Sequence, residues 1–111
     1  MRNELFLKDE WTQEEFLNNQ ELLKKDGIET ILVDTILKPI DGIKTVVYNP
    51  FDLLNYPKDK TVFVFYCDTG KSTKERLEFY KSKLPGFKCV SLRGGRGYWR
   101  PNFRLLKKSD D

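Results

Sequence analysis

Histidine is absent from this sequence of 111 residues. That absence excludes histidine-ligated metal sites, Ser-His and Cys-His catalytic pairs, and a histidine general base. Cysteine is scarce, because Cys67 and Cys89 are the only two, and their spacing is not that of a C-x-x-C motif. We expect both to be free thiols in a reducing compartment, since disulfides persist mainly in oxidising ones.

Long apolar runs are also missing. No segment approaches the ~20 apolar residues of a membrane-spanning helix. The amino-terminal MRNELFLKDE lacks the apolar centre of a signal peptide. We therefore expect a cytoplasmic protein without membrane contacts. The net charge is +3, but no basic run carries interleaved aromatic residues, so we expect no nucleic-acid partner.

The chain is long enough for one compact domain, residues 1–111, and its 39% hydrophobic content is enough to build a core. Thr12 and Glu15 form the pattern of a capping box, which predicts a helix from there to about Lys25. The spacing of later apolar residues predicts one helix over about 73–84.

A β-branched and aromatic run predicts a buried strand over 61–66, and shorter apolar runs at 31–33, 45–48 and 89–92 predict further strands. Strands that alternate with helices indicate an α/β fold with a mainly parallel sheet covered on both faces. Ligands bind such sheets beyond the carboxyl ends of the strands. Cys67 lies at an end of that kind, because it directly follows the 61–66 strand.

Cys67 opens a polar loop that continues through Asp68, Thr69, Gly70, Lys71 and Ser72. A cysteine attacks as its thiolate, so a catalytic Cys67 needs a pKa below the usual ~8.5. The helix that follows, inward-turned N–H groups around Gly70, and the positive charges of Lys71 and Lys74 favour the thiolate, whereas the negative charge of Asp68 opposes it. We therefore predict that Cys67 is a nucleophile. The alternative is a buried, inert cysteine, which would not need a glycine-containing polar loop.

Two phosphate-binding motifs come close to this loop without matching it. Gly70-Lys71-Ser72 resembles the end of a Walker A motif, but the position five residues before Gly70 holds Phe65 instead of glycine. A cysteine phosphatase needs an arginine six residues after the cysteine to grip phosphate, and that position holds Thr73. Nucleotide hydrolysis is disfavoured, and a cysteine phosphatase is the weakest function still open.

Two segments of the chain resemble the rhodanese family of sulfurtransferases. The first, VFVFYCDTGKST at 62–73, has a hydrophobic strand, a cysteine, a glycine three residues later and a threonine six residues later. The second, GFKCVSLRGG at 86–95, is followed by Trp99 four residues after its last glycine. With weaker matches such as ILVD at 31–34, the resemblance covers most of the chain, from about Thr12 to Trp99.

The resemblance implies a rhodanese-like α/β domain with a five-stranded, mostly parallel sheet and helices on both faces. It implies transfer of sulfane sulfur from thiosulfate or a persulfide to a thiol, or to cyanide in an assay, through a persulfide on Cys67. The loop residues that would bind the anion are Asp68, Thr69, Gly70, Lys71, Ser72 and Thr73. No metal or organic cofactor is implied. The implied partners are a small anionic sulfur donor and a thiol acceptor, either a small thiol or a thioredoxin-like protein.

Three further residues, Asp34, Gly94 and Gly95, are candidates for supporting the loop. Asp34 would either accept hydrogen bonds from the loop or cap its own strand, and the sequence favours neither role. Gly94 and Gly95 are expected to form a turn with positive φ beside the loop. Cys89 could resolve a persulfide on Cys67 as a disulfide, but its position on a strand favours ordinary packing.

The sequence departs from the family pattern between Asp34 and Gly42. Ile36 stands where the family commonly has arginine, and Gly42 stands where it has histidine. These departures keep open a function of another class, a catalytically silent rhodanese-like module that binds or regulates another protein. In such a module Cys67 would titrate like an ordinary thiol.

Overall fold

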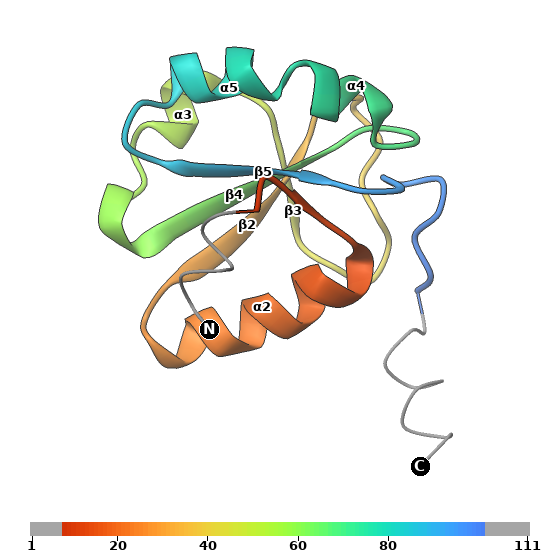
Figure 1. Cartoon of the computed structure of the whole chain (residues 1–111), viewed down its shortest axis with the longest axis horizontal. Helices are drawn as coiled ribbons and strands as arrows, with labels where there is room; N and C mark the ends of the chain where they lie inside the picture. The colour runs from red at the N-terminus through yellow and green to blue at the C-terminus, as the bar shows by residue number, and fades with distance from the viewer. Residues whose placement is uncertain (1–7, 102–111) are drawn as a thin grey trace.

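A computed structural model of the chain describes residues 8–101. Five strands form one sheet in the order β1-β5-β4-β2-β3, and every neighbouring pair is parallel (Figure 1). The strands are β1 (Glu10–Trp11), β2 (Glu29–Asp34), β3 (Thr45–Val47), β4 (Thr61–Tyr66) and β5 (Lys88–Leu92). The expected α/β class and the five-stranded parallel sheet are confirmed, although the short β1 was not predicted.

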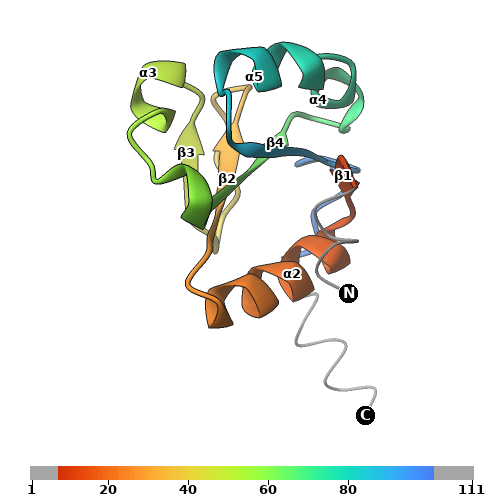
Figure 2. The ribbon, with the colours of Figure 1, turned by 60° about the vertical axis from the view of Figure 1, so that its left-hand side comes forward.

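Helices cover both faces of the sheet, as expected. α2 (Gln13–Lys25) packs on one face, and three short helices lie on the other, as the two views in Figures 1 and 2 show. These three are α3 (Pro50–Leu53), α4 (Lys71–Glu75) and α5 (Leu77–Lys83), and a 3-10 turn, η1 (Lys58–Lys60), leads into β4.

The start of α2 confirms the capping box. The Glu15 N–H donates to the Thr12 hydroxyl oxygen at 3.1 Å, and the Thr12 N–H donates back to the Glu15 carboxylate at 3.0 Å. The helix ends at Lys25, and Gly27 follows with φ of 76°, which a residue without a Cβ adopts without strain.

The single helix expected over 73–84 is wrong. The chain forms α4 and α5 instead, and Arg76 lies between them with φ of −97° and ψ of 5°. The break allows two different attachments: Thr73 of α4 faces the end of β4, whereas Leu77 and Tyr80 of α5 pack into the apolar layer beneath. Periodicity could not reveal the break, because the apolar residues that predicted the helix, Leu77, Tyr80 and Leu84, all follow Arg76, and α4 contains no apolar residue.

β4 is the centre of the sheet, and all of its residues are buried. Its side chains alternate between two apolar clusters, as strand geometry requires. Val62, Val64 and Tyr66 join the cluster under α2, while Phe63 and Phe65 join the one under α5. Phe65 stacks on Tyr80 with ring centres 4.4 Å apart. This packing fixes the carboxyl end of β4, and hence the start of the loop at Cys67.

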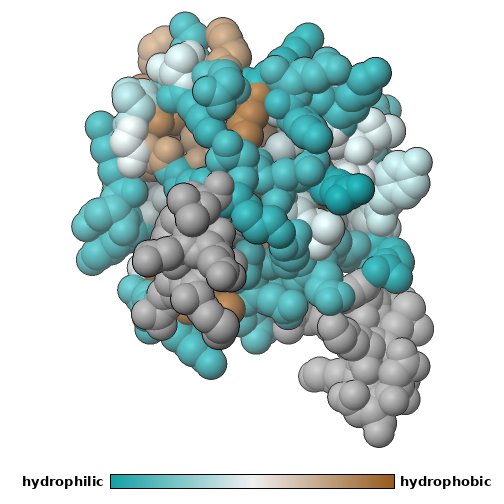
Figure 3. Space-filling view, in the orientation of Figure 1, coloured by the Kyte–Doolittle hydropathy of each residue, from teal (hydrophilic) through white to brown (hydrophobic). Residues whose placement is uncertain are grey.

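The surface is uneven in character. Hydrophobic atoms gather over α3 and α5, where Phe51 and Phe79 are exposed, and the side where β5 ends is mostly hydrophilic (Figure 3). Within residues 8–101, no helix has the length and apolar character that crossing a membrane would require. The amino-terminal segment considered above for a signal peptide includes residues 1–7, which lie outside the described range.

Candidate active site

Cys67 directly follows β4 at the carboxyl edge of the sheet. The chain leaves β2 for β3 on one side of the sheet and leaves β4 for β5 on the other. The loops after β2 and β4 therefore diverge at this edge. Such a divergence is the position at which parallel α/β sheets bind ligands.

The loop turns back on the Cys67 sulfur. The Gly70 N–H donates to Cys67 Sγ with an N···S distance of 3.1 Å. Gly70 has φ of 89°, and a Cβ at this position would lie 2.8 Å from the Leu92 carbonyl oxygen. Both the left-handed backbone and the lack of space require glycine here.

Thr73, the residue six positions after the cysteine, is fully buried below the sulfur. Its Oγ1 lies 3.6 Å from Cys67 Sγ and 3.3 Å from the Gly70 carbonyl oxygen, to which it donates. On its other side it lies 2.8 Å from Oγ of Ser91, a buried residue of β5. Sequence reasoning missed Ser91, although it stands inside the segment 86–95 that carries the family resemblance.

The surroundings of Cys67 act on its pKa in opposite directions. Burial raises the pKa, because a thiolate loses hydration. The backbone N–H and hydroxyl of Thr73 and the backbone N–H groups of Gly70 and Thr69 stabilise the thiolate more strongly, so the pKa is held below that of an ordinary thiol. The direction of this shift agrees with the prediction from the sequence, and hydrogen bonds from the loop cause it.

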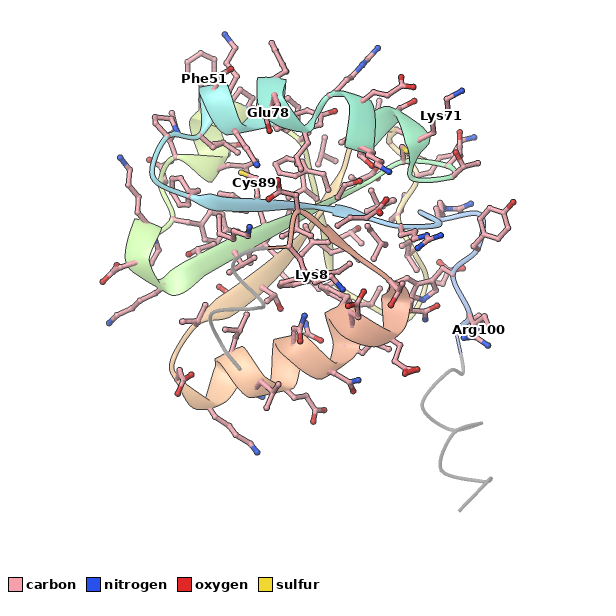
Figure 4. The ribbon with its side chains drawn as sticks, viewed as in Figure 1. Lys8, Phe51, Lys71, Glu78, Cys89 and Arg100 are labelled. Atoms are coloured by element: carbon pink, nitrogen blue, oxygen red, sulfur yellow. The ribbon has the colours of Figure 1, made fainter. Side chains whose placement is uncertain are left out.

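The other four loop residues lie at the surface. Asp68, Thr69, Lys71 and Ser72 are all exposed. The Thr69 hydroxyl accepts from the Lys71 N–H at 3.5 Å. The Lys71 side chain extends from the start of α4 away from the sheet (Figure 4). Of the six predicted anion-binding residues, Gly70 and Thr73 lie within hydrogen-bond distance of the sulfur, at 3.1 and 3.6 Å, and the Thr69 backbone N–H also stabilises the thiolate.

A second loop, residues 93–98 after β5, clamps the first one through its backbone. The Arg96 N–H donates to the Cys67 carbonyl oxygen at 2.8 Å, and the Gly97 N–H donates to that of Asp68 at 2.7 Å. A Cβ on Gly95 would overlap the Cys67 carbonyl oxygen, and Gly95 has φ of 55°. The predicted positive-φ turn is present at Gly94 and Gly95 and lies against the loop.

Two residues of this clamp were not predicted, namely Arg96 and Gly97. A Cβ on Gly97 would lie 2.7 Å from the Asp68 carbonyl oxygen, so a third glycine is needed here. The repeated glycines of Gly-Gly-Arg-Gly were a usable signal for close backbone approach. Arg96 gave no signal, because it acts partly through its backbone.

Asp34 caps its own turn. Its Oδ1 accepts from the Ile36 N–H at 2.8 Å, within the segment that follows β2. Burial, and then the negative charge of Asp34, raise the pKa of Tyr66, whose hydroxyl donates to the Lys38 carbonyl oxygen at 2.7 Å. Asp34 thus organises the neighbouring loop, and its hydrogen bond does not reach the Cys67 loop.

Cys89 is remote from Cys67. It pairs in register with Phe63, four residues before Cys67, which corresponds to about 13 Å along the sheet. It is fully buried in the apolar cluster under α5, and burial raises its pKa to about 11. The packing role is supported, and a direct disulfide with Cys67 is out of reach.

The two aromatic residues after the glycine loop, Tyr98 and Trp99, have different surroundings. Trp99 packs edge-on against Phe16 of α2, with ring centres 6.1 Å apart, and closes the core on that side. Tyr98 is 71% exposed. Among residues 8–101, no three side chains of histidine, cysteine, aspartate or glutamate gather closely enough to hold a metal ion.

No protein-family model, curated protein or solved structure matches the chain. A proposal about its function therefore rests on the geometry around Cys67.

Proposed function

We propose that the chain is a rhodanese-like sulfurtransferase that carries sulfur as a persulfide on Cys67. One observation carries the proposal: the Gly70 N–H and the Thr73 hydroxyl converge on a sulfur whose pKa lies below that of an ordinary thiol. A packing cysteine needs no such stabilisation. A nucleophilic one does, because only the thiolate attacks.

The first step would load the sulfur. The Cys67 thiolate attacks the outer sulfur of thiosulfate, a new S–S bond forms, and the bond between the two thiosulfate sulfurs breaks with its electron pair leaving on sulfite. The product is a Cys67 persulfide anion, and the total charge is unchanged. The N–H groups that stabilise the thiolate are already in place for the negative charge that remains on the loop.

The second step would unload it. The thiolate of an acceptor attacks the terminal sulfur of the persulfide, and the electron pair of the breaking S–S bond returns to Cys67. Cys67 is a thiolate again, and the acceptor carries the extra sulfur. Hydrogen-bond donors around Sγ favour this step as well, because they stabilise the leaving thiolate.

The two alternatives differ in their support. Thr73 stands where a cysteine phosphatase needs arginine, and its single hydroxyl, which is also fully buried, cannot replace the two parallel N–H donors of a guanidinium. A silent interaction module is favoured by one observation: the Cys67 side chain is only 3% exposed. An enzyme and such a module differ in one measurable property: a small sulfur donor can transfer its sulfur to Cys67 in the enzyme and cannot in the module.

The test is intact-mass measurement after incubation with thiosulfate and removal of the excess. We expect a gain of one sulfur atom in the wild-type chain and none in Cys67→Ser, while Cys89→Ala behaves as the wild type. Cyanide should then remove the sulfur as thiocyanate. A chain that gains no sulfur from thiosulfate, and none from a persulfide such as glutathione persulfide, would overturn the proposal and favour the interaction module.

A further inference from the structure

We propose that the sulfur acceptor is a cysteine on an acidic, partly apolar polypeptide segment of another protein, which docks around Cys67. The inference rests on the proposed sulfurtransferase function. The docking surface consists of three segments at the carboxyl edge of the sheet, at residues 35–38, 68–72 and 93–98. In Figure 1 this edge lies on the side where α4 begins and β5 ends.

Hydrogen bonds join these segments into one surface. Arg96 holds its own segment against the residues that adjoin the other two, because its backbone N–H donates to the carbonyl oxygen of Cys67, just before 68–72, and its Nε donates to that of Pro39, just after 35–38, at 3.1 Å. The Thr35 hydroxyl donates to the Tyr66 carbonyl oxygen at 2.8 Å, one residue before the cysteine. The positions of the three segments relative to Cys67 are therefore fixed.

The chain has no second thiol that could take the sulfur from Cys67. Cys89 lies about 13 Å away along the sheet and is fully buried among apolar side chains. A thiol that resolves a persulfide on Cys67 must consequently come from another molecule. The surface around Cys67 then determines which thiols approach.

Leu37 is the most unusual residue of this surface. Its φ is 58°, which makes it the one non-glycine residue with positive φ among residues 8–101, and its side chain is 74% exposed. The left-handed conformation costs a branched residue about 1–2 kcal/mol, and burial does not offset that cost here. Backbone strain of this kind clusters at functional sites. A leucine held in solvent beside the site fits a contact that forms in a complex.

Tyr98 supplies a second apolar contact on the other side of Cys67. Its side chain is 71% exposed, and its N–H donates to the Gly94 carbonyl oxygen at 3.2 Å. A Cβ on Gly94 would lie 3.1 Å from Tyr98 Cβ, so the base of the ring is held against the glycine loop. Tyrosine and arginine are the residues most enriched at the energetic centres of protein interfaces.

The charge of the surface selects the partner. Its exposed charged residues are four cations and one anion, namely Lys38, Lys71, Arg93, Arg96 and Asp68. None of the four cations forms an ion pair with a carboxylate of residues 8–101. An acidic segment would be attracted to these charges, and its apolar side chains would cover Leu37 and Tyr98. A small thiol acceptor is too short to cover both Leu37 and Tyr98.

The first experiment compares acceptors. The persulfide form, prepared with thiosulfate and verified by mass, is mixed with one of two short peptides. Each has a central cysteine and leucine, and the flanking residues are glutamate in one and lysine in the other. We expect the glutamate peptide to accept sulfur at least about tenfold faster, after correction for the thiolate fraction of each peptide, and the difference to shrink in about 0.5 M salt. Equal rates, or a faster lysine peptide, would overturn the proposal.

Variants of the chain then distinguish an apolar contact at Leu37 from general electrostatic attraction of the peptide. Leu37→Asn should lower the rate for the glutamate peptide relative to that for 2-mercaptoethanol, because asparagine tolerates the left-handed backbone and only the apolar contact is lost. Leu22→Asn is the matched control, since Leu22 is exposed on α2 outside the docking surface, and its rate ratio should equal that of the wild type. The same ratio in Leu37→Asn as in the wild type would contradict docking on this surface.

A binding measurement tests the docking surface without sulfur transfer. The glutamate peptide with serine in place of cysteine is titrated into the unmodified chain, alongside a short single-stranded oligonucleotide. Binding of the peptide that weakens in Leu37→Asn supports docking even if no persulfide forms, in which case only the proposed function fails. Tighter binding of the oligonucleotide, unaffected by Leu37→Asn, would mean general attraction of polyanions and would overturn the inference.

Discussion

Ser91 Oγ lies 2.8 Å from Thr73 Oγ1, which in turn lies 3.6 Å from the sulfur of Cys67. The Thr73 hydroxyl has one proton, and the Gly70 carbonyl oxygen at 3.3 Å competes with the sulfur for it. If Ser91 donates to Thr73, the Thr73 proton is free for one of these two acceptors, and a thiolate is the stronger attraction. In that arrangement Ser91 orients the Thr73 hydroxyl and acts on Cys67 through it.

Replacing Ser91 by alanine should raise the pKa of Cys67, because Thr73 then loses the partner that orients it. The rate of iodoacetamide alkylation at mildly acidic pH should fall roughly two- to tenfold, the range that corresponds to one hydrogen bond. The measurement is the pH profile of alkylation. Ser82→Ala is the control, since that hydroxyl donates to the Phe79 carbonyl oxygen on the exposed side of α5. Superimposable profiles for Ser91→Ala and the wild type would show that the contact has no electrostatic role.

The contact between Gly95 and Cys67 predicts a large effect of a single methyl group. Gly95→Ala should lower the free energy of unfolding by about 1 kcal/mol for positive φ and by about 2 kcal/mol more for the overlap with the Cys67 carbonyl oxygen. Gly42→Ala is the matched control, because Gly42 also has positive φ, at 85°, but a Cβ there would meet no atom within 4 Å. Urea unfolding measures the free energy of unfolding of the two variants. Equal decreases would mean that residues 93–98 move away from the Cys67 carbonyl oxygen at no energetic cost.

Local patterns in the sequence were sufficient for much of the fold. The run 61–66 predicted β4 residue for residue, because a β-branched and aromatic segment buried on both faces has no competing structure. The Thr12 and Glu15 pair located the start of α2, since both halves of a capping box lie within one turn. The loop after Cys67 was predicted from Gly70 for the same local reason.

Contacts between distant segments were the part that the sequence alone did not reveal. Ser91 and Arg96 approach Cys67 only because β5 lies beside β4, and no pattern near Cys67 indicates which strand is its neighbour. The two-residue β1 is similarly held by β5, since Arg93 N–H donates to the Trp11 carbonyl oxygen at 2.7 Å. The break at Arg76 separates α4, whose buried residue is Thr73, from α5, whose buried residues are Leu77 and Tyr80, and the polar run 71–76 carries no pattern that marks it.

The lowered pKa of Cys67 predicts how stability changes with pH. An acid with a folded-state pKa below its unfolded-state value stabilises the folded chain above the unfolded-state value, and this stabilisation is lost as the pH falls through the folded-state value. The unfolding free energy of the wild type minus that of Cys67→Ser should therefore increase from mildly acidic pH to about pH 9. Cys89, whose pKa is raised, acts in the opposite direction in both chains and cancels in the difference. Urea titrations at several pH values provide the measurement, and a difference that does not change with pH would contradict stabilisation of the thiolate.

The opposite shifts of the two thiols predict selective modification of the native chain. Burial raises the pKa of Cys89 from 9.0 to about 11, so its thiolate fraction is roughly a hundredfold below that of an ordinary cysteine. The pKa of Cys67 is lowered. Iodoacetamide at neutral pH should therefore add one group per chain, at Cys67, and Cys89 should react only after the chain is unfolded in urea. Intact-mass and peptide analysis of wild type, Cys67→Ser and Cys89→Ala gives the assignment. Native Cys67→Ser should stay unmodified while Cys89→Ala gains one group, and alkylation of Cys89 at a rate similar to Cys67 would mean that the fold does not distinguish the two thiols.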